Sequence, residues 1–355
     1  MIESPSYTTE LDEPTESTDS RLQATERNLA RLEQELFRLT NRLTALEGRD
    51  VGWKVRVKSL IKRVIGFRLH SFQQYSPRPL RTPARYLANA TKLKNAPVIS
   101  IVTPSFNHGR FIEATLRSVI EQDYQPLEYI VQDGGSRDET QDIVRRFAPH
   151  LKHFAFARDR GQSHAINLGF EHATGDIMAY LNSDDLLLPG ALHYVAAYFD
   201  RHPDVDVVYG HRVIIDSDGS EIGRFVLPQH SDTMLSWADY VPQETMFWRR
   251  RIWDRVGGAI DESFQFAMDW DLLLRFRDAG ARFVRLPRFL GSFRVHDAQK
   301  THVQIATHGE REMTRLRTRV HGRPVSRIEI RNAMSTYVVR QAMHDRLYRL
   351  GLLRY

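Results

Sequence analysis

An alternation of short apolar runs with longer amphipathic stretches constrains the fold of this chain more than any other feature. The apolar runs have the length of buried strands, and the stretches between them place apolar residues at helical spacing. The expected strands are residues 98–103, 127–132, 154–157, 176–182 and 205–210, and the expected helices are residues 111–122, 139–147, 163–172 and 190–200. This rhythm predicts an α/β fold, a Rossmann-like, mostly parallel sheet with helices on both faces.

The residues before this core differ from it in composition. Residues 1–20 hold six acidic residues and no Lys or Arg, which predicts a disordered acidic tail. Residues 21–48 repeat leucine every seven residues, which predicts a coiled coil and hence a homo-oligomer. A single amphipathic helix packed on its own domain is the alternative for this segment.

Residues 51–70 have the pattern of a basic amphipathic helix. One helical face collects the apolar side chains of Trp53, Val57, Leu60, Ile61 and Val64. Such a helix binds an anionic membrane surface, or it docks on the core with its basic face in water. The proline-containing residues 71–96 are a predicted linker, residues 97–300 the core domain, and residues 301–355 an Arg-rich helical region.

Charge is distributed unevenly along the chain. Residues 96–310 carry a net charge of −8, whereas residues 51–95 carry +11 and residues 311–355 carry +8. A pI of about 9.5 can indicate nucleic-acid binding, but these cations lie outside the core among few aromatic side chains, so no nucleic acid is expected. The lack of cysteine, of a signal peptide and of a long apolar run predicts a cytoplasmic protein, at most peripheral at the inner face of the membrane.

The apolar run that ends at Asn182 is followed by two adjacent acidic residues, Asp184 and Asp185. Ligands of open α/β sheets bind at the carboxyl edge of the strands. Two carboxylates at that edge repel each other unless a cation lies between them, and a hard divalent ion takes oxygen ligands. The pattern therefore indicates a metal site, with a solvated turn before the next helix as the alternative.

Loops beside the other expected strands carry polar residues at the same edge. The candidates are Pro104, Ser105 and Asn107 after the first strand, Asp133 and Ser136 after the second, and Asp159 and Gln162 before the helix at residues 163–172. Glycines beside Asp133 allow a ligand to approach the backbone closely. Taken singly, each loop is better explained as an ordinary helix cap.

Two further groups lie later in the chain. Asp269 and Asp271 stand at the start of an amphipathic helical stretch, where the helix dipole favours an ionised carboxylate. Their functional interpretation is a general base for a substrate hydroxyl, and the alternative is helix capping. His296 follows a strand-like segment, where a histidine is more often structural than a ligand.

Taken together, these segments resemble the family 2 glycosyltransferases of the GT-A fold over residues 97–300. The resemblance rests on five motifs in order, VISIVTPSFN, QDGGS, DRGQS, YLNSDD and MDWDL. It implies that the nucleotide sugar is bound by Pro104, Ser105, Asn107, Asp133, Ser136, Asp159, Gln162, Asn182 and Asp184. It also implies Asp184, Asp185 and His296 as ligands of Mn²⁺ or Mg²⁺, Asp269 as the catalytic base, and Gln243 and Asp271 beside the acceptor.

Two positions depart from the family's pattern. The usual metal motif has an acid two positions before its last acid, where this chain has Ser183, so either Asp184 or Asp185 can be the direct ligand. The residue before the catalytic base is usually Glu, and here it is Met268, so the local acidity differs.

The resemblance implies an inverting, metal-assisted transfer from a nucleoside diphosphate sugar, with UDP as the expected nucleotide. The implied acceptor is a hydroxyl of a glycan or lipid-linked molecule in cell-surface polysaccharide synthesis. The alternative from another class is a catalytically inactive coiled-coil scaffold that binds a sugar nucleotide. Release of free nucleoside diphosphate in the presence of Mn²⁺ distinguishes the enzyme from the scaffold.

Overall fold

The structure is a computed structural model, and it describes residues 72–88, 93–297, 299 and 308–355. These residues belong to one compact unit, which spans Ile65–Tyr355. The predicted acidic tail, coiled coil and basic helix lie outside the described residues.

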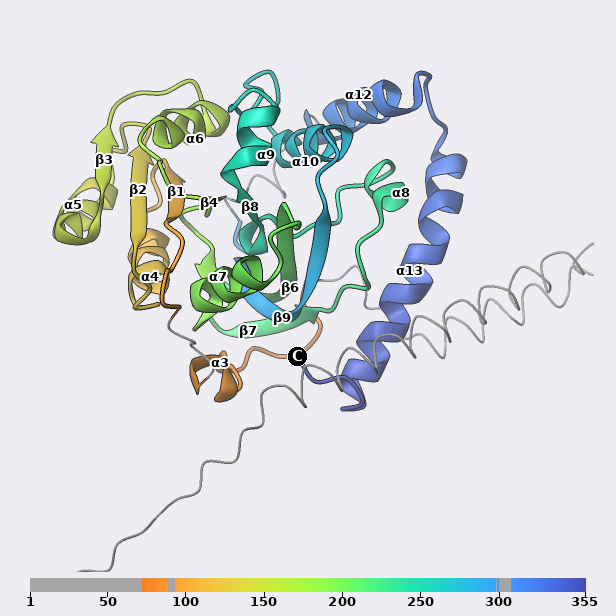
Figure 1. Cartoon of the computed structure of the whole chain (residues 1–355), viewed down its shortest axis with the longest axis horizontal. Helices are drawn as coiled ribbons and strands as arrows, with labels where there is room; N and C mark the ends of the chain where they lie inside the picture. The colour runs from red at the N-terminus through yellow and green to blue at the C-terminus, as the bar shows by residue number, and fades with distance from the viewer. Residues whose placement is uncertain (1–71, 89–92, 298, 300–307) are drawn as a thin grey trace, which may run out of the picture. The chain divides into compact units, whose positions relative to one another are not determined.

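A nine-stranded mixed sheet forms the centre of this unit (Figure 1). Its strands are β1 (Ile99–Ser105), β2 (Leu127–Asp133), β3 (His153–Phe156), β4 (Ile177–Tyr180), β5 (Leu186–Leu187), β6 (Val207–Ile215), β7 (Glu221–Phe225), β8 (Phe247–Arg249) and β9 (Phe283–Arg294). The strand order is β3-β2-β1-β4-β8-β6-β9-β5, with β7 paired to β6. Pairs β1–β2, β2–β3, β1–β4 and β6–β9 are parallel, whereas β5, β7 and β8 pair antiparallel. The predicted α/β fold with a mostly parallel sheet is confirmed.

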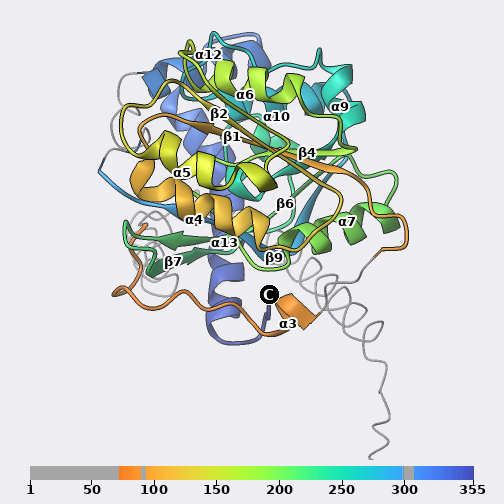
Figure 2. The same cartoon turned by 90° about the vertical axis from the view of Figure 1, so that its left-hand side faces the viewer.

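Helices cover both faces of the sheet (Figure 2). One face carries α4 (Gly109–Ile120), α5 (Thr140–Arg146) and α7 (Ala191–Arg201), and the other carries α6 (Gln162–Glu171), α9 (Arg250–Arg255), α10 (Met268–Asp278) and α12 (Glu310–His321). The short elements are η1 (Ala148–His150), α8 (Asp232–Leu235) and η2 (Gln243–Thr245). Each face has its own apolar core, and the consecutive β1 residues Ile101 and Val102 enter opposite cores, because side chains alternate along a strand.

The apolar spacing of α4 shows how the sequence dictates this packing. Ile112, Leu116 and Val119 are fully buried at intervals of four and three residues, whereas Arg110 and Glu121 remain exposed. Strand β1 is buried along its whole length, as expected when helices cover both faces of a parallel sheet. Both elements were readable from the sequence for this reason.

Residues 72–88, within the predicted linker, contact the edge of the sheet. The ring of Phe72 lies 5.6 Å from that of Phe293. Arg78 pairs with the buried Glu221 of β7 at 2.6 Å, and the short helix α3 (Arg85–Ala88) follows. This stretch therefore packs along β7 rather than crossing solvent between two domains.

Two helices, α12 and α13 (Arg327–Arg349), complete the described chain and confirm the predicted helical C-terminal region. Gly322 ends α12 in the left-handed conformation at φ 66°, which costs glycine little. Ser326 begins α13 with a capping box that includes Glu329. Within the described residues, no helix combines the length and the hydropathy needed to span a bilayer.

Candidate active site

The carboxyl ends of the parallel strands meet at one edge of the sheet. Ser105, the last residue of β1, is in register with Asp133, the last of β2, and Asp133 is in register with Phe156, the last of β3. Strand β4 ends nearby, because its Tyr180 pairs with Val102 of β1. The loops that follow these strands are therefore neighbours, as the alternation of strands and helices predicts.

The loops after β1 and β2 interlock. The fully buried Asp133 carboxylate accepts hydrogen bonds from two backbone N–H groups of its own loop, at 2.7 and 3.0 Å, and from the Ser136 hydroxyl. The backbone N–H of the exposed Asn107 donates to Ser136 Oγ at 2.7 Å. Pro104 is buried in β1, and the buried Ser105 hydroxyl has no hydrogen-bond partner among the described residues. Asp133 thus holds the loop in shape, and Ser105 and Asn107 can meet a ligand.

Asp159 and Gln162 lie against these loops. A Cβ on Gly134 would lie only 2.7 Å from Asp159 Oδ2, so glycine is needed for this close approach. Asp159 also accepts a hydrogen bond from Gly161 N at 2.8 Å. Gln162 Nε2 donates to Asn182 Oδ1 at 2.6 Å, which joins the start of α6 to the turn after β4.

That turn presents Asp184 to two histidines. Asp184 Oδ2 lies 3.0 Å from His296 Nε2, and both residues are buried. Ser183 Oγ lies 2.6 Å from His108 Nδ1, and the rings of His108 and His296 are 6.1 Å apart. Burial by itself raises the pKa of Asp184, but the hydrogen bond with His296 and the charge of His108 outweigh it, so the net pKa is lowered.

Asp185 has different surroundings from Asp184. Its Oδ1 accepts a hydrogen bond from Arg294 N at 3.0 Å, and its Oδ2 lies 3.5 Å from Asn182 Nδ2. Burial, followed by the charge of Asp184, raises the pKa of Asp185 well above its ordinary value. The two adjacent acids are therefore not equivalent, and Asp184 is the one that faces a histidine.

Asp184 and His296 fit a divalent cation as two of its ligands. A carboxylate oxygen and an imidazole nitrogen already converge within 3.0 Å, and transition metals such as manganese accept both. The part of the chain that the structure describes contains no group of three or more His, Asp or Glu side chains arranged to hold an ion. An ion at this pair would take its remaining ligands from water or a bound substrate.

Asp269, the second residue of α10, lies close to the same turn. The connection runs through α6, whose Gln162 contacts the turn and whose Ser163 Oγ lies 2.8 Å from the sulfur of Met268. Burial raises the pKa of Asp269 to about 6, and the charge of Glu244 adds to the effect. A carboxylate that titrates this close to neutral pH suits a general base.

Three charged residues near Asp269 were not predicted. Arg212 forms a two-point ion pair with the buried Glu244, at 2.8 and 2.5 Å, and its charge lowers the pKa of Asp269. Desolvation by the surrounding protein, followed by the charge of Asp269, raises the pKa of Asp239 well above its ordinary value. Arg212 could have been suspected as a charged residue inside an apolar strand, and Glu244 as the neighbour of Gln243. The loop of Asp239 has no comparable pattern.

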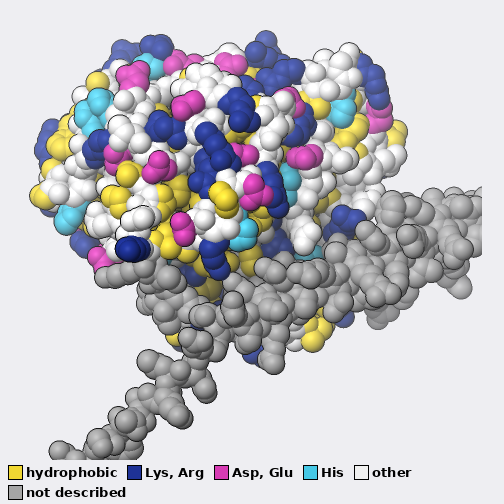
Figure 3. Space-filling model, viewed as in Figure 1, with side chains coloured by type: hydrophobic (Ala, Val, Ile, Leu, Met, Phe, Trp, Pro, Cys, Tyr) yellow, Lys and Arg dark blue, Asp and Glu magenta, His cyan; other side chains and the backbone are white. Residues whose placement is uncertain are grey.

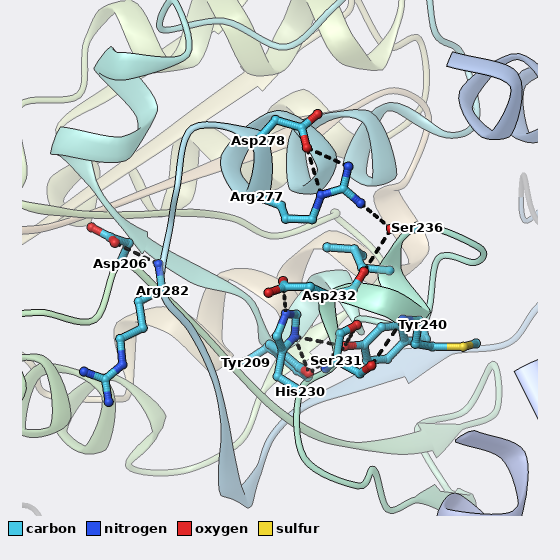
Figure 4. Close-up of polar contacts among 12 residues, drawn as sticks. Asp206, Tyr209, His230, Ser231, Asp232, Ser236, Tyr240, Arg277, Asp278 and Arg282 are labelled. Carbon is cyan, nitrogen blue, oxygen red and sulfur yellow. Dashed lines mark hydrogen bonds and ion pairs between the residues drawn. The ribbon is translucent and has the colours of Figure 1, made fainter. Parts of the chain in front are cut away.

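The loop that carries Asp239 is held by the polar network of Figure 4. His230 Nδ1 lies 2.9 Å from the Tyr240 hydroxyl, and its Nε2 lies 3.0 Å from Asp232 Oδ1. The backbone N–H of Ser231 donates to the same Tyr240 hydroxyl at 2.9 Å. Burial is the main influence on His230 and lowers its pKa, so the ring is neutral at pH 7 and acts as a fixed link.

Two further bonds fix this loop against the site. Trp270 Nε1, next to Asp269 in the chain, donates to Leu235 O at 2.8 Å. At the other end of the loop, Gln243 Nε2 donates to Tyr180 O at 2.7 Å, and Gln243 Oε1 accepts from Asn182 Nδ2 at 3.2 Å. Gln243 therefore lies in the candidate site, beside the turn that carries Asp184.

Asp271 lies elsewhere, although the sequence placed it beside the acceptor. It is fully buried, and its carboxylate oxygens pair with Arg275 at 2.8 Å and Arg319 at 2.6 Å. These contacts join α10 to α12. Asp271 is two residues from Asp269, which is about 200° around a helix, so the two carboxylates point to different sides and Asp271 has a structural position.

Comparisons with known proteins show the family and the fold. The family model described as glycosyl transferase family 2 matches residues 100–258. A PGL/p-HBAD biosynthesis glycosyltransferase of Mycobacterium tuberculosis is 31% identical over 184 residues, which are 51% of this chain and 70% of that protein. The O-antigen biosynthesis protein RfbC of Myxococcus xanthus is 30% identical over 207 residues, 56% of this chain and 16% of its own length. S. aureus TarS 1–349, solved in complex with UDP-GlcNAc, is similar in fold, with a TM-score of 0.52, 17% identity, and coverage of 68% of this chain and 72% of that one.

Proposed function

Because this chain belongs to glycosyl transferase family 2 and is a nucleotide-sugar-dependent glycosyltransferase, we propose an inverting reaction. In this reaction the protein transfers one sugar to a hydroxyl of a glycan or lipid-linked acceptor. The observation that carries the proposal is the position of Asp269. This carboxylate lies in the first turn of α10, which α6 joins to the turn that holds Asp184, and burial raises its pKa to about 6.

The proposed step is a single displacement. Asp269 accepts the proton of the acceptor hydroxyl while that oxygen forms a bond to the anomeric carbon of the donor sugar. The bond between the anomeric carbon and the phosphate oxygen breaks, and its electron pair leaves with the nucleoside diphosphate. One displacement inverts the configuration, and no covalent enzyme intermediate is needed.

The donor is proposed to lie across the loops after β1 and β2. The unpaired Ser105 hydroxyl and the exposed Asn107 would meet the nucleotide, for which we propose UDP, over a loop that Asp133 and Ser136 hold in shape. Asp159, Gln162 and Asn182, which contact one another or the same loops, would border the donor sugar.

We propose that Mn²⁺ or Mg²⁺ binds at Asp184 and His296, with Asp185 outside the direct ligand set. Both oxygens of Asp185 lie near donors of the protein, Arg294 N and Asn182 Nδ2, whereas Asp184 Oδ2 lies 3.0 Å from the imidazole of His296, which can itself be a ligand. A bound cation supplies charge neutralisation for the diphosphate leaving group.

The acceptor is proposed to lie between Asp269 and Gln243, over the loop that Figure 4 shows fixed by His230 and Tyr240. Relatives named for PGL/p-HBAD and O-antigen biosynthesis support an acceptor in cell-envelope glycan or glycolipid synthesis. Self-association through residues 21–48, and contact of residues 51–70 with an anionic membrane, remain proposals from sequence. No nucleic-acid partner is proposed, because the excess Lys and Arg lie outside residues 96–310. On the face shown in Figure 3, Lys and Arg are interspersed with Asp and Glu.

The experiment is a transfer assay of the full chain with a panel of nucleotide sugars and Mn²⁺, in which nucleoside diphosphate release and the anomeric configuration of the product are measured. Asp269→Asn should bind the donor and fail to transfer. Asp278→Asn, a substitution at an exposed acid on the same helix, is the matched control and should keep full activity. Transfer by the Asp269→Asn protein, or retention of configuration, would refute the proposed step.

A further inference from the structure

The exposed apolar side chains of this protein are concentrated at its C-terminal end. Five large apolar residues are exposed in the described part of the chain, and four of them follow residue 327: Ile328, Val339, Leu350 and Leu352, at 60, 42, 63 and 65% exposure. The fifth, Phe106, lies in the loop after β1. Isolated exposed apolar residues are common, but their collection on one element marks an interaction surface.

Three of these residues share one side of α13 and its cap. Ile328, Val339 and Leu350 are separated by eleven residues each, and eleven residues make about three helical turns, so each is rotated by only about 20° from the one before. They form a line about 33 Å long at 1.5 Å per residue. Tyr337 and Tyr348 repeat at the same interval, about 180° from Ile328.

The tyrosine side of α13 packs on the protein. The Tyr337 ring lies 4.7 Å from that of Tyr240, and the Tyr348 hydroxyl accepts a hydrogen bond from Arg224 at 2.7 Å. Figure 1 shows α13 along the edge of the described unit. The helix is therefore fixed by one side, and the line of Ile328 and Val339 faces outward.

Two arginines of this C-terminal segment are exposed without an acidic partner in the described chain. Arg331 and Arg354 are exposed, and neither guanidinium contacts a carboxylate within the described chain. The two acids of α13 are both paired, Glu329 with Arg323 at 2.5 Å and Asp345 with Arg349 at 2.6 Å. An outward face with apolar side chains and unpaired arginines is complementary to an anionic bilayer. The arginines can pair with the anionic headgroups, and the apolar side chains can enter the boundary of the acyl chains.

We infer that this face of α13, defined by Ile328, Arg331, Val339, Leu350, Leu352 and Arg354, docks on an anionic lipid membrane. It differs from the membrane contact proposed for residues 51–70, because it lies in the folded unit and has a fixed relation to the active site through Tyr337 and Tyr240. The inference does not depend on the proposed chemistry, since it concerns binding alone. A docked helix would hold the site at a constant height above the bilayer.

The test is flotation of the full chain with vesicles of phosphatidylcholine, with and without phosphatidylglycerol. The wild-type chain should float only with the anionic vesicles. The triple substitution Ile328→Ser, Val339→Ser, Leu350→Ser and the double substitution Arg331→Glu, Arg354→Glu should each lower partitioning about ten-fold or more, because both kinds of contact contribute to binding. Arg311→Glu, at an exposed arginine of α12, is the matched charge control and should bind as the wild type does.

Unchanged thermal denaturation of the variants would show that they are folded, which is expected because the substituted side chains are exposed. Equal flotation of wild type and triple variant would overturn the inference and assign binding to another part of the chain. Equal flotation with neutral vesicles would overturn the role of charge. A wild-type chain that does not float, but whose mass in light scattering falls on triple substitution, would identify the face as a contact between copies instead.

Discussion

Replacement of Asp269 by Asn should abolish transfer and at the same time stabilise the fold. The reason is that the reaction needs the ionised carboxylate, and ionisation of this buried group lowers the stability of the folded protein. Burial raises the pKa of Asp269 to about 6, whereas an aspartate in the unfolded chain titrates near 3.9. The folded protein therefore resists the charge that makes Asp269 a base.

The pH dependence of transfer follows directly. Only the ionised form accepts the proton, so kcat/KM should fall as the pH drops through about 6. About one-tenth of the activity should remain one pH unit below that pKa, and about one-hundredth two units below. A base with an ordinary pKa would instead remain active down to about pH 4.

The stability effect has the opposite sign to that of a salt-bridged acid. Because the folded-state pKa is raised, the unfolded chain loses its proton first, and the free energy of unfolding falls between about pH 4 and pH 6 and stays lowered above that range. A shift of about two units corresponds to about 3 kcal/mol, which is an upper figure because Asp269 retains some contact with solvent. Asp269→Asn, which cannot ionise, should recover about 1–3 kcal/mol at pH 7.5 and nothing at pH 4.

Urea denaturation of both proteins at the two pH values measures this difference, and nucleoside diphosphate release measures kcat/KM across the same range. Asp278→Asn, on the same helix and exposed, should alter neither quantity by more than experimental error. An Asp269→Asn protein that is less stable than wild type at pH 7.5, or an acidic limb near pH 4, would refute the assignment of Asp269 as a buried base.

Three further predictions concern the neighbours of this residue. Asp184→Asn should raise the Mn²⁺ concentration needed for half-maximal activity ten-fold or more, because the remaining ligand His296 cannot replace the lost carboxylate. A titration of the transfer rate with Mn²⁺ measures this concentration, and an unchanged value would contradict the prediction. The pKa of Asp239 is raised well above its ordinary value, partly by the charge of Asp269 itself, so Asp239 is largely neutral where Asp269 titrates. Asp239→Asn should therefore leave the acidic limb of kcat/KM near pH 6 and the donor KM unchanged; a limb that moves to lower pH would show that Asp239 is ionised beside the base. Arg319→Met leaves the buried Asp271 with one ion-pair partner and should lower the free energy of unfolding by about 1–3 kcal/mol in urea titrations. A change in kcat without a change in stability would instead indicate that Asp271 acts in the active site.

Much of this architecture can be read from local pattern. Buried strands and amphipathic helices have periods that the sequence displays directly, as the run ending at Asn182 and the spacing of Ile112 and Leu116 show. Strand β8 was not predicted, because three residues are too few to show a period. The packing of residues 72–88 was not predicted either, because their contacts to Glu221 and Phe293 are far apart in the chain.

The candidate site divides in the same way. Sequence alone indicated which acids follow a strand or lie in the first turn of a helix, and so singled out Asp184, Asp185 and Asp269 as candidates, because those positions depend on neighbours within a few residues. Only the tertiary structure decided which of them share surroundings: it set Asp184 against His296, turned Asp185 toward Arg294 N, and placed Asp271 in the core. The physical reason is that the pKa and the partners of a carboxylate depend on burial and on charges brought from distant segments, and these exist only once the chain has folded.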